Sequence, residues 1–380
     1  MIILFAWSVI AFTWWLVALW LLASRVRSDI SVAQPTLPPA SSRPSVTIFK
    51  PLPPIRDERE RAALTHAIAS FAAQLAPQDE LIVGLNIDHE AAWLPSVQSW
   101  RASAPNAQIR VVTRALPTQH ANPKIAWLEV LSADARGELW LWSDADVSAP
   151  SDFLNTACGQ LLKGNVNAVT APYCIRQVDE ARQVLDAIYV NLEFLPGALL
   201  LDRLNQKKFA YGAATLLRAA TFKQRADWKQ LGNALADDYK LGELLQPVAL
   251  GPTMVSTFTR PLTWLAAWEH YYRWQKTVRW CQPGGFAALL VLMPLWGWCI
   301  APMFGVQYGA TLTGLSGVMA GEIVVALFAC WLVGCRLPVR SWFGVLLWPF
   351  TRPVVWLLVW LPLPVLWSGR KREWFAPEER

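Results

Sequence analysis

The sequence contains an aspartate pair, Asp144 and Asp146, that directly follows the almost wholly apolar segment Leu139–Ser143. In an extended chain alternate side chains point to the same side, so the two carboxylates should lie together at the end of a strand. Carboxylate and phosphate oxygens suit Mg²⁺ or Mn²⁺, which stabilises the negative charge that builds on a leaving nucleotide. The alternative is a solvated acidic turn, because Asp is common in turns. The apolar strand before the pair favours a metal and donor site.

Two further residues could bind a nucleotide donor. Asp88 follows the apolar segment that begins at Leu81, and could bind the nucleoside. Lys124 follows Asn122-Pro123 ahead of a predicted helix, where its cation could face the donor phosphates. A loop carboxylate and a surface lysine are the simpler interpretations of these residues taken singly.

A second acidic pair, Asp237 and Asp238, precedes the helical stretch Leu241–Leu245. One of the two could be the N-cap of that helix. The other could act as a general base that takes the proton from an acceptor hydroxyl. Adjacent carboxylates repel each other, which could raise one pKa to a value useful for this role.

A basic and aromatic segment contains His270, Arg273 and Trp274, with Lys276 and Arg279 following. Arginine suits pyrophosphate, and tryptophan can stack on a sugar or line an acceptor pocket. An aromatic and basic belt at a membrane interface has the same composition. The two interpretations are compatible, and we keep both.

The elements that must position these residues alternate between short apolar runs and helical stretches. The candidate strands are Val46–Phe49, Leu81–Asn86, Ile109–Val112, Leu139–Ser143 and Ala168–Ala171, and the candidate helices are Ala62–Ala73, Ile125–Leu131 and Asp152–Leu162. This alternation predicts an α/β fold with a mostly parallel sheet covered by helices. Ligands bind such sheets at the carboxyl ends of the strands, which is where the acidic residues are expected.

The composition is too apolar for a wholly soluble protein, with 54% hydrophobic and 16% charged residues. Met1–Ala23 carries no charge and is long enough to cross a bilayer. Two further spans are expected at Gly284–Phe304 and Thr311–Gly334. The last apolar run, Ser341–Trp367, is interrupted at Trp348–Pro353, which favours a broken helix pair that dips in and returns, or lies at the interface.

The positive-inside rule places the chain after Arg25 in the cytoplasm. The expected organisation is a transmembrane anchor (1–24), a linker (25–45), a cytoplasmic catalytic domain (46–283), C-terminal membrane segments (284–367) and a basic tail (368–380). The formal charge of +6 forms no stripe with interleaved aromatics, which argues against nucleic acid as a partner. Anionic lipid head groups or donor phosphates explain this charge better.

Taken in order, these segments resemble the ceramide glucosyltransferase family, including its bacterial hopanoid-associated branch, among the inverting nucleotide-sugar transferases of the GT-A fold. No single motif is specific, but their order and spacing are. The matching pieces are Phe49-Lys50-Pro51-Leu52, Asp88, Asn122-Pro123-Lys124, Ser143-Asp144-Ala145-Asp146, Tyr211-Gly212, Leu217-Arg218, Asp237-Asp238-Tyr239 and Arg273-Trp274.

The resemblance implies inverting transfer from a UDP-sugar to the hydroxyl of a membrane lipid of ceramide or hopanoid type, in a bacterial inner membrane. It implies Asp88 and Lys124 for the nucleotide. It further implies Asp144 and Asp146 for the donor and a divalent metal, and Asp238 as the base.

Two positions depart from the family pattern. Gln or Arg is usual three residues before the Arg-Trp pair, whereas His270 precedes Arg273 and, in an alternative register, Lys276 precedes Arg279. Position 237 is Asp where Glu is commoner. Two other functions stay open: a processive polysaccharide synthase, for which the few C-terminal spans look insufficient, and a non-catalytic membrane scaffold.

Overall fold

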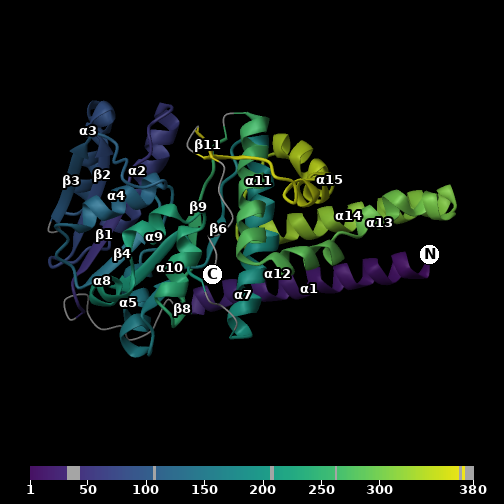
Figure 1. The fold of residues 1–380 in the computed structure, drawn as a ribbon, viewed down its shortest axis with the longest axis horizontal. Coiled ribbons are helices and arrows are strands. Elements are labelled where there is room, and N and C mark those ends of the chain that lie inside the picture. The colour runs from purple at the N-terminus through teal and green to yellow at the C-terminus, as the bar shows by residue number, and fades with distance from the viewer. Residues whose placement is uncertain (32–42, 106–107, 206–208, 262, 368–369, 373–380) are drawn as a thin grey trace. The chain divides into compact units, whose positions relative to one another are not determined.

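The computed structural model describes residues 1–31, 43–105, 108–205, 209–261, 263–367 and 370–372 (Figure 1). By their contacts these residues form two units. The sheet unit comprises Arg27–Cys174 and Leu201–Phe258, and the helical unit comprises Met1–Val26, Ile175–Leu200 and Thr259–Arg380. Most of the predicted linker and of the basic tail, residues 32–42 and 373–380, lies outside the described residues.

The sheet unit is built on a seven-stranded mixed sheet with the strand order β3-β2-β1-β4-β7-β5-β8. Strands β1 to β4 run parallel, as do β5 and β8, whereas β7 runs antiparallel to both of its neighbours. The strands are β1 (Val46–Pro51), β2 (Glu80–Asn86), β3 (Gln108–Arg114), β4 (Leu139–Ser143), β5 (Ala168–Thr170), β7 (Ala214–Arg218) and β8 (Val248–Leu250), and a second, two-stranded sheet holds β6 (Tyr173–Ile175) and β9 (Val255–Thr257).

Helices cover both faces of this sheet because its central strands are apolar on both sides. One core joins the strands to α2 (Glu58–Ala72), α3 (Glu90–Ser103) and α5 (Phe153–Lys163). The other core, which contains Phe49, Trp140 and Trp142, joins them to α4 (Pro123–Ser132), α8 (Ala219–Arg225), α9 (Trp228–Asn233) and α10 (Asp237–Leu244). Such two-sided burial is what a parallel sheet requires.

The predicted α/β fold is confirmed. All five candidate strands and all three candidate helices are present, with ends that shift by a few residues. The strand β7 was not predicted, although its apolar side chains complete the core beside β4. It makes the sheet mixed, so the prediction of a mostly parallel sheet holds for β1 to β4.

The order of the strands reverses between β1 and β4. From β1 the chain moves to β2 and β3 on one side, and it then returns to place β4 on the other side of β1. In open α/β sheets, the crevice at such a reversal lies outside the carboxyl ends of the two strands and is where ligands bind. Here those ends carry Lys50 and Asp144.

The helical unit contains most of the long apolar helices. Its elements are α1 (Ile2–Ser31) and α7 (Leu195–Arg203), which both begin in this unit, η3 (Ala181–Gln183), α6 (Val184–Ile188), the π-helical turn η4 (Tyr189–Phe194), α11 (Trp264–Cys281), α12 (Pro283–Ala288), η5 (Leu289–Leu292), α13 (Pro294–Ile300), η6 (Ala301–Phe304), α14 (Tyr308–Leu332), η7 (Val339–Ser341), α15 (Trp342–Leu358) and the strands β10 (Val365–Trp367) and β11 (Arg370–Arg372).

Among the described residues, three helices are long and apolar enough to cross a membrane: Ile2–Asp29, Ala181–Arg203 and Tyr308–Leu332. A fourth candidate is the pair Pro283–Leu292 and Pro294–Phe304, which is bent by 59°. The span predicted at Gly284–Phe304 is therefore broken near Met293. The helix Ala181–Arg203 was not predicted as a span, because charged residues interrupt its apolar pattern.

The break predicted at Trp348–Pro353 is wrong. Pro349 and Pro353 lie inside the single helix α15. Each proline removes one backbone donor, which normally ends or kinks a helix. Here Trp348, Pro349 and Pro353 are all buried, so tertiary packing outweighs that cost. The strands β10 and β11 follow as an antiparallel pair.

Small residues allow three apolar helices of this unit to pack closely. A Cβ atom at Gly314 of α14 would lie 2.3 Å from the Trp298 ring, and one at Gly321 would lie 2.4 Å from Phe12 of α1. Trp298 also donates a hydrogen bond of 3.0 Å to Ser8. Close approach at small residues is the usual way in which helices pack in a bilayer.

A buried ion triad also joins the helices of this unit. The Arg352 Nε lies 2.7 Å from a Glu193 carboxylate oxygen, and the Arg352 Nη1 lies 3.7 Å from a Glu322 carboxylate oxygen. The Arg352 side chain is only 2% exposed, and its guanidinium lies 4.8 Å from the centre of the Trp15 ring. One arginine therefore holds elements η4, α14 and α15 together.

Replacing this arginine should destabilise the protein strongly. Arg352→Leu would leave Glu193 and Glu322 buried without their cation, and losing one partner of a buried ion pair costs ~3–5 kcal/mol. We expect a clear drop in the thermal unfolding midpoint in detergent micelles. The control is Arg340→Leu, at an exposed position. Equal midpoints for the two variants would show that the triad contributes nothing to stability.

Candidate active site

The aspartate pair lies at the carboxyl end of β4, as predicted. Asp144 follows Ser143, and its Oδ1 is 2.6 Å from the Lys124 ammonium. Two residues on, Asp146 accepts a hydrogen bond of 3.1 Å from the Thr257 hydroxyl of β9. The two carboxylates are thus held from opposite flanks, by a helix N-terminus and by a separate strand.

Lys124 joins the two acidic pairs. Besides Asp144, its ammonium lies 3.7 Å from Asp237 and donates a hydrogen bond of 3.2 Å to the Gly212 carbonyl oxygen. Burial by itself would lower the pKa of Lys124, but the negative charges of Asp144, Asp237 and Asp238 outweigh it and raise the pKa. The lysine therefore stays charged, and the interpretation as a lone surface lysine is wrong.

Local sequence explains why Lys124 points here. Asn122 is the N-cap of α4, where its side-chain oxygen accepts hydrogen bonds from the Lys124 and Ile125 amides. Pro123 takes the first helical position, where its missing donor costs nothing. The Asn122 side-chain amide then donates a hydrogen bond of 3.1 Å to Asp237. One capping residue thus orients Lys124 and also holds the second acidic pair.

Asp237 and Asp238 lie in the first turn of α10, and neither is its N-cap, which is Ala236. The capping alternative is therefore wrong. The two carboxylates have different surroundings: Asp237 faces Asn122 and Lys124, whereas Asp238 faces Gly212. A Cβ atom at Gly212 would lie 3.2 Å from an Asp238 carboxylate oxygen, so glycine allows the close approach.

Burial and the charge of Asp237 raise the pKa of Asp238 to about 6. Burial and the charge of Asp144 likewise raise the pKa of Asp146 to about 6. Each acidic pair therefore contains one carboxylate that holds its proton more tightly than an ordinary aspartate does. Lys124 lies between the pairs and limits this effect for the members nearest to it.

Asp88 lies in the short turn η2 (Ile87–His89) after β2, at the same sheet edge as Asp144. Its side chain is exposed, and its amide donates a hydrogen bond to the Asn86 side chain. The position at a strand's carboxyl end is the expected one. Its role in nucleoside binding stays a prediction.

Sequence reasoning assigned no role to Lys50, which the structure places beneath the aspartate pair. This side chain is fully buried at the end of β1 and donates hydrogen bonds to the Ser143 hydroxyl (2.9 Å) and to the carbonyl oxygens of Asp144 (2.8 Å) and Val147 (3.3 Å). Burial lowers the pKa of Lys50 to about 7, although Asp144 and Asp146 favour its charged form. The signal in the sequence was a single cation at the end of an apolar strand.

Lys50 should therefore shape the turn that carries Asp144 and Asp146. In Lys50→Met the Asp144 and Val147 carbonyl oxygens lose a buried donor, at a cost of ~1–3 kcal/mol for an unsatisfied polar group. We expect weaker donor binding together with a lower unfolding midpoint. The control is Lys163→Met at an exposed position of α5. Donor affinity equal to wild type in Lys50→Met would remove Lys50 from the site.

His270, Arg273 and Trp274 lie on α11 in the helical unit. The His270 Nδ1 is 3.0 Å from a carboxylate oxygen of Asp186, and the His270 and Trp274 ring centres are 4.3 Å apart. These three residues thus share one part of the helical unit. The structure describes them within that unit alone.

The alternative register, Lys276 and Arg279, has a different use. The Lys276 ammonium donates hydrogen bonds to the Leu361 and Leu363 carbonyl oxygens, at 3.1 and 2.6 Å, and Arg279 donates one of 3.0 Å to the Val359 carbonyl oxygen. These carbonyls follow the C-terminal end of α15, where cations are favourable. This role supports the register that begins at His270.

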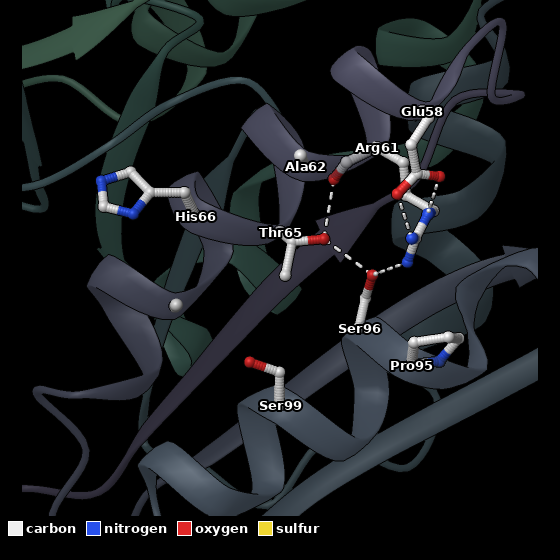
Figure 2. Close-up of a pocket in the computed structure, with 9 residues that line it drawn as sticks. Glu58, Arg61, Ala62, Thr65, His66, Pro95, Ser96 and Ser99 are labelled. Atoms are coloured by element: carbon white, nitrogen blue, oxygen red, sulfur yellow. Dashed lines mark hydrogen bonds and ion pairs between the residues drawn. The ribbon is translucent and has the colours of Figure 1, made fainter.

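Figure 2 shows a polar surface hollow of about 380 Å³ between α2 and α3. There Arg61 donates a hydrogen bond of 3.3 Å to Ser96, and the Thr65 and Ser96 hydroxyl oxygens are 2.7 Å apart. The predicted site residues do not line it. The hollow is formed by two helices on one face of the sheet, whereas the acidic residues lie at the strand ends.

The mixed α/β sheet, with carboxylates and a lysine gathered at the carboxyl ends beside its reversal point, defines a domain of the GT-A type. The chain belongs to glycosyl transferase family 21, whose family model matches residues 3–374. It is therefore a glycosyltransferase, ceramide glucosyltransferase-like, that uses a nucleotide sugar.

One similar solved structure is the mannosyltransferase PcManGT from Pyrobaculum calidifontis in complex with GDP-Man and Mn²⁺. Its sequence is 15% identical, the match covers 93% of this chain and 99% of that chain, and the TM-score is 0.44. A comparison with curated protein sequences finds no match.

Proposed function

We propose that the protein transfers a sugar from a UDP-sugar to the hydroxyl of a membrane lipid of ceramide or hopanoid type, with inversion at the anomeric carbon. The observation that carries this proposal is the ion network of Lys124, which joins Asp144 to the Asp237–Asp238 pair. A donor-binding carboxylate and a candidate base are thereby gathered at one edge of the sheet.

In this proposal Asp238 is the base. Direct displacement requires a group that takes the hydroxyl proton as the oxygen attacks the anomeric carbon. Asp237 is held by Asn122 and Lys124, which suits a positioning role. Asp238, with a pKa raised to about 6 by burial and by Asp237, is a stronger base than an ordinary aspartate and is still ionised at neutral pH.

The donor would lie beside Asp144, Asp146 and Lys124, with Asp88 toward the nucleoside. Asp144 and Asp146 offer the hard oxygen ligands that Mg²⁺ or Mn²⁺ prefers, and such ions commonly use one or two carboxylates and complete their shell with substrate phosphates. Among the described residues, no group of three or more His, Cys, Asp or Glu side chains gathers into a metal site. When bound, the metal neutralises charge on the leaving diphosphate.

The lipid acceptor is proposed from the long apolar helices. Up to four described spans are apolar enough to cross a membrane, and α11 carries His270, Arg273 and Trp274 close to them in sequence. We assign these three residues to the acceptor and the phosphates. The chain would be an integral protein of a bacterial inner membrane, with its sheet unit in the cytoplasm, as the charges after Arg25 predict.

The test is transfer by purified protein in nanodiscs, with a panel of UDP-sugars and lipid extracts and mass detection of products. We expect one hexose per lipid, and long polymers would instead identify a processive synthase. Asp238→Asn should lower the rate by at least ~10²-fold through loss of the base. The control is Asp134→Asn, whose side chain is 84% exposed. Equal transfer by wild type and Asp238→Asn would contradict the assignment.

The rate should depend on pH through Asp238. Because its pKa is about 6, the ionised base is lost as the pH falls through 6, and kcat should drop about tenfold for each further unit. Ionised Asp238 is disfavoured in the folded state relative to an ordinary unfolded pKa near ~4. Asp238→Asn should therefore raise the unfolding midpoint at pH 8 and leave it unchanged near pH 4. A lower midpoint at pH 8 would contradict the raised pKa.

Metal removal gives a separate test. We expect EDTA to abolish transfer and Mn²⁺ or Mg²⁺ to restore it, because the two carboxylates bind the donor diphosphate through the ion. Asp146→Asn should require a higher metal concentration for half-maximal rate, whereas Asp134→Asn should not. Undiminished transfer in excess EDTA would exclude the metal role of Asp144 and Asp146.

A further inference from the structure

The helical unit buries a carboxylate for which sequence reasoning gave no role. Asp186 lies on α6 between apolar residues that are themselves buried, Leu185 and Ala187, and its side chain is 0% exposed. One of its oxygens, Oδ2, is 3.0 Å from the His270 Nδ1. The other, Oδ1, has no hydrogen-bond partner among the residues that the structure describes.

Such a carboxylate is costly to bury, because its charge loses the hydration that it has in water. A helix of apolar residues that only needed to pack would tolerate Asn, Ala or Leu at this position more easily. The interaction with His270 offsets part of the cost, and it requires an aspartate oxygen close to the ring. Asp186 is therefore placed to act on His270.

The contact determines how His270 is presented. A carboxylate accepts hydrogen bonds, so the His270 Nδ1 must carry the hydrogen that it shares with Asp186. In the neutral ring the Nε2 then has a lone pair and accepts a hydrogen bond. The His270 side chain is 27% exposed, so the ring is accessible.

The surroundings of the ring indicate which ligand this nitrogen would meet. The centres of the His270 and Trp274 rings are 4.3 Å apart, and Trp274 is 5.6 Å from Tyr189. An aromatic wall with one hydrogen-bond acceptor suits an amphipathic molecule that carries a hydroxyl group. A phosphate oxygen would need a donor at the same place, which the neutral ring does not offer at Nε2.

We propose that Asp186 is a positioning residue that holds His270 with its Nε2 as the acceptor for the hydroxyl of the lipid substrate. The proposal rests on the proposed function, since it assigns the lipid acceptor of that reaction to a particular pair. His270 touches the hydroxyl and orients it. Asp186 acts only through His270, and the proton itself goes to the base.

The test separates lipid binding from donor binding. Asp186→Asn keeps the size of the side chain, but its amide can donate to Nδ1 and so place the ring hydrogen on Nε2. We expect the KM for the lipid to rise about tenfold, as for the loss of one hydrogen bond, with the KM for the nucleotide sugar unchanged. The matched control is Asp179→Asn, at an exposed position nearby in the sequence.

Coupling provides the second readout. His270→Gln should raise the KM for the lipid to a similar extent, and the double variant should be no worse than either single variant, because Asp186 acts through His270. An equal rise in both KM values, or full additivity of the two substitutions, would indicate a merely structural role and overturn the proposal.

The ring itself can be observed without any transfer reaction. The chain has four histidines, so ¹⁵N-histidine NMR spectra of wild type and His270→Gln in nanodiscs identify the His270 signals. We expect the tautomer with hydrogen on Nδ1 in wild type. Hydrogen on Nε2 in the neutral ring would overturn the proposal even if Asp186→Asn failed to fold. If wild type transferred no sugar to any lipid, the proposed function would fail, whereas these spectra would still report on the pair.

Discussion

The candidate site depends on one ammonium group. Asp144 and Asp237 come from segments far apart in the chain, after β4 and at the start of α10, and their charges oppose any close approach. Lys124 lies 2.6 Å from the first and 3.7 Å from the second, and it also holds the Gly212 backbone. Without this cation, two pairs of carboxylates could not share one edge of the sheet at an acceptable electrostatic cost.

The same charge balance prepares the site for its substrates. Lys124 lies nearest to Asp144 and Asp237, so the excess negative charge falls on Asp146 and Asp238, whose pKa values are both raised to about 6 by burial and by the neighbouring acid. An enzyme that binds a cation and a diphosphate at one end, and removes a proton at the other, needs this division. Beneath it, Lys50 holds the carbonyl oxygens of Asp144 and Val147, so the acidic turn is supported by a second buried cation.

The helical unit solves a related problem in apolar surroundings. Arg352 balances Glu193 and Glu322, and Asp186 has His270, so the buried acids of these helices each face a cation or a ring that can donate a hydrogen bond. Ionisable residues among membrane helices are costly and usually serve a purpose. Here one group joins elements of the unit, and the other orients a residue of the segment that we assign to the acceptor.

The sequence by itself was sufficient for the strands β1 to β4, the α/β class and the family, because apolar periodicity and the order of short motifs are local properties of the chain. It also placed Asp144, Asp146 and Lys124 correctly at strand and helix ends, where caps and strand termini have local signals. It did not distinguish Asp237 from Asp238, assign a role to Lys50, or connect Asp186 with His270. Those outcomes depend on contacts between residues up to 115 positions apart, such as Asn122 with Asp237. The continuity of α15 through Pro349 and Pro353 was likewise decided by packing, since local propensity favours a break there and only burial against neighbouring helices outweighs it.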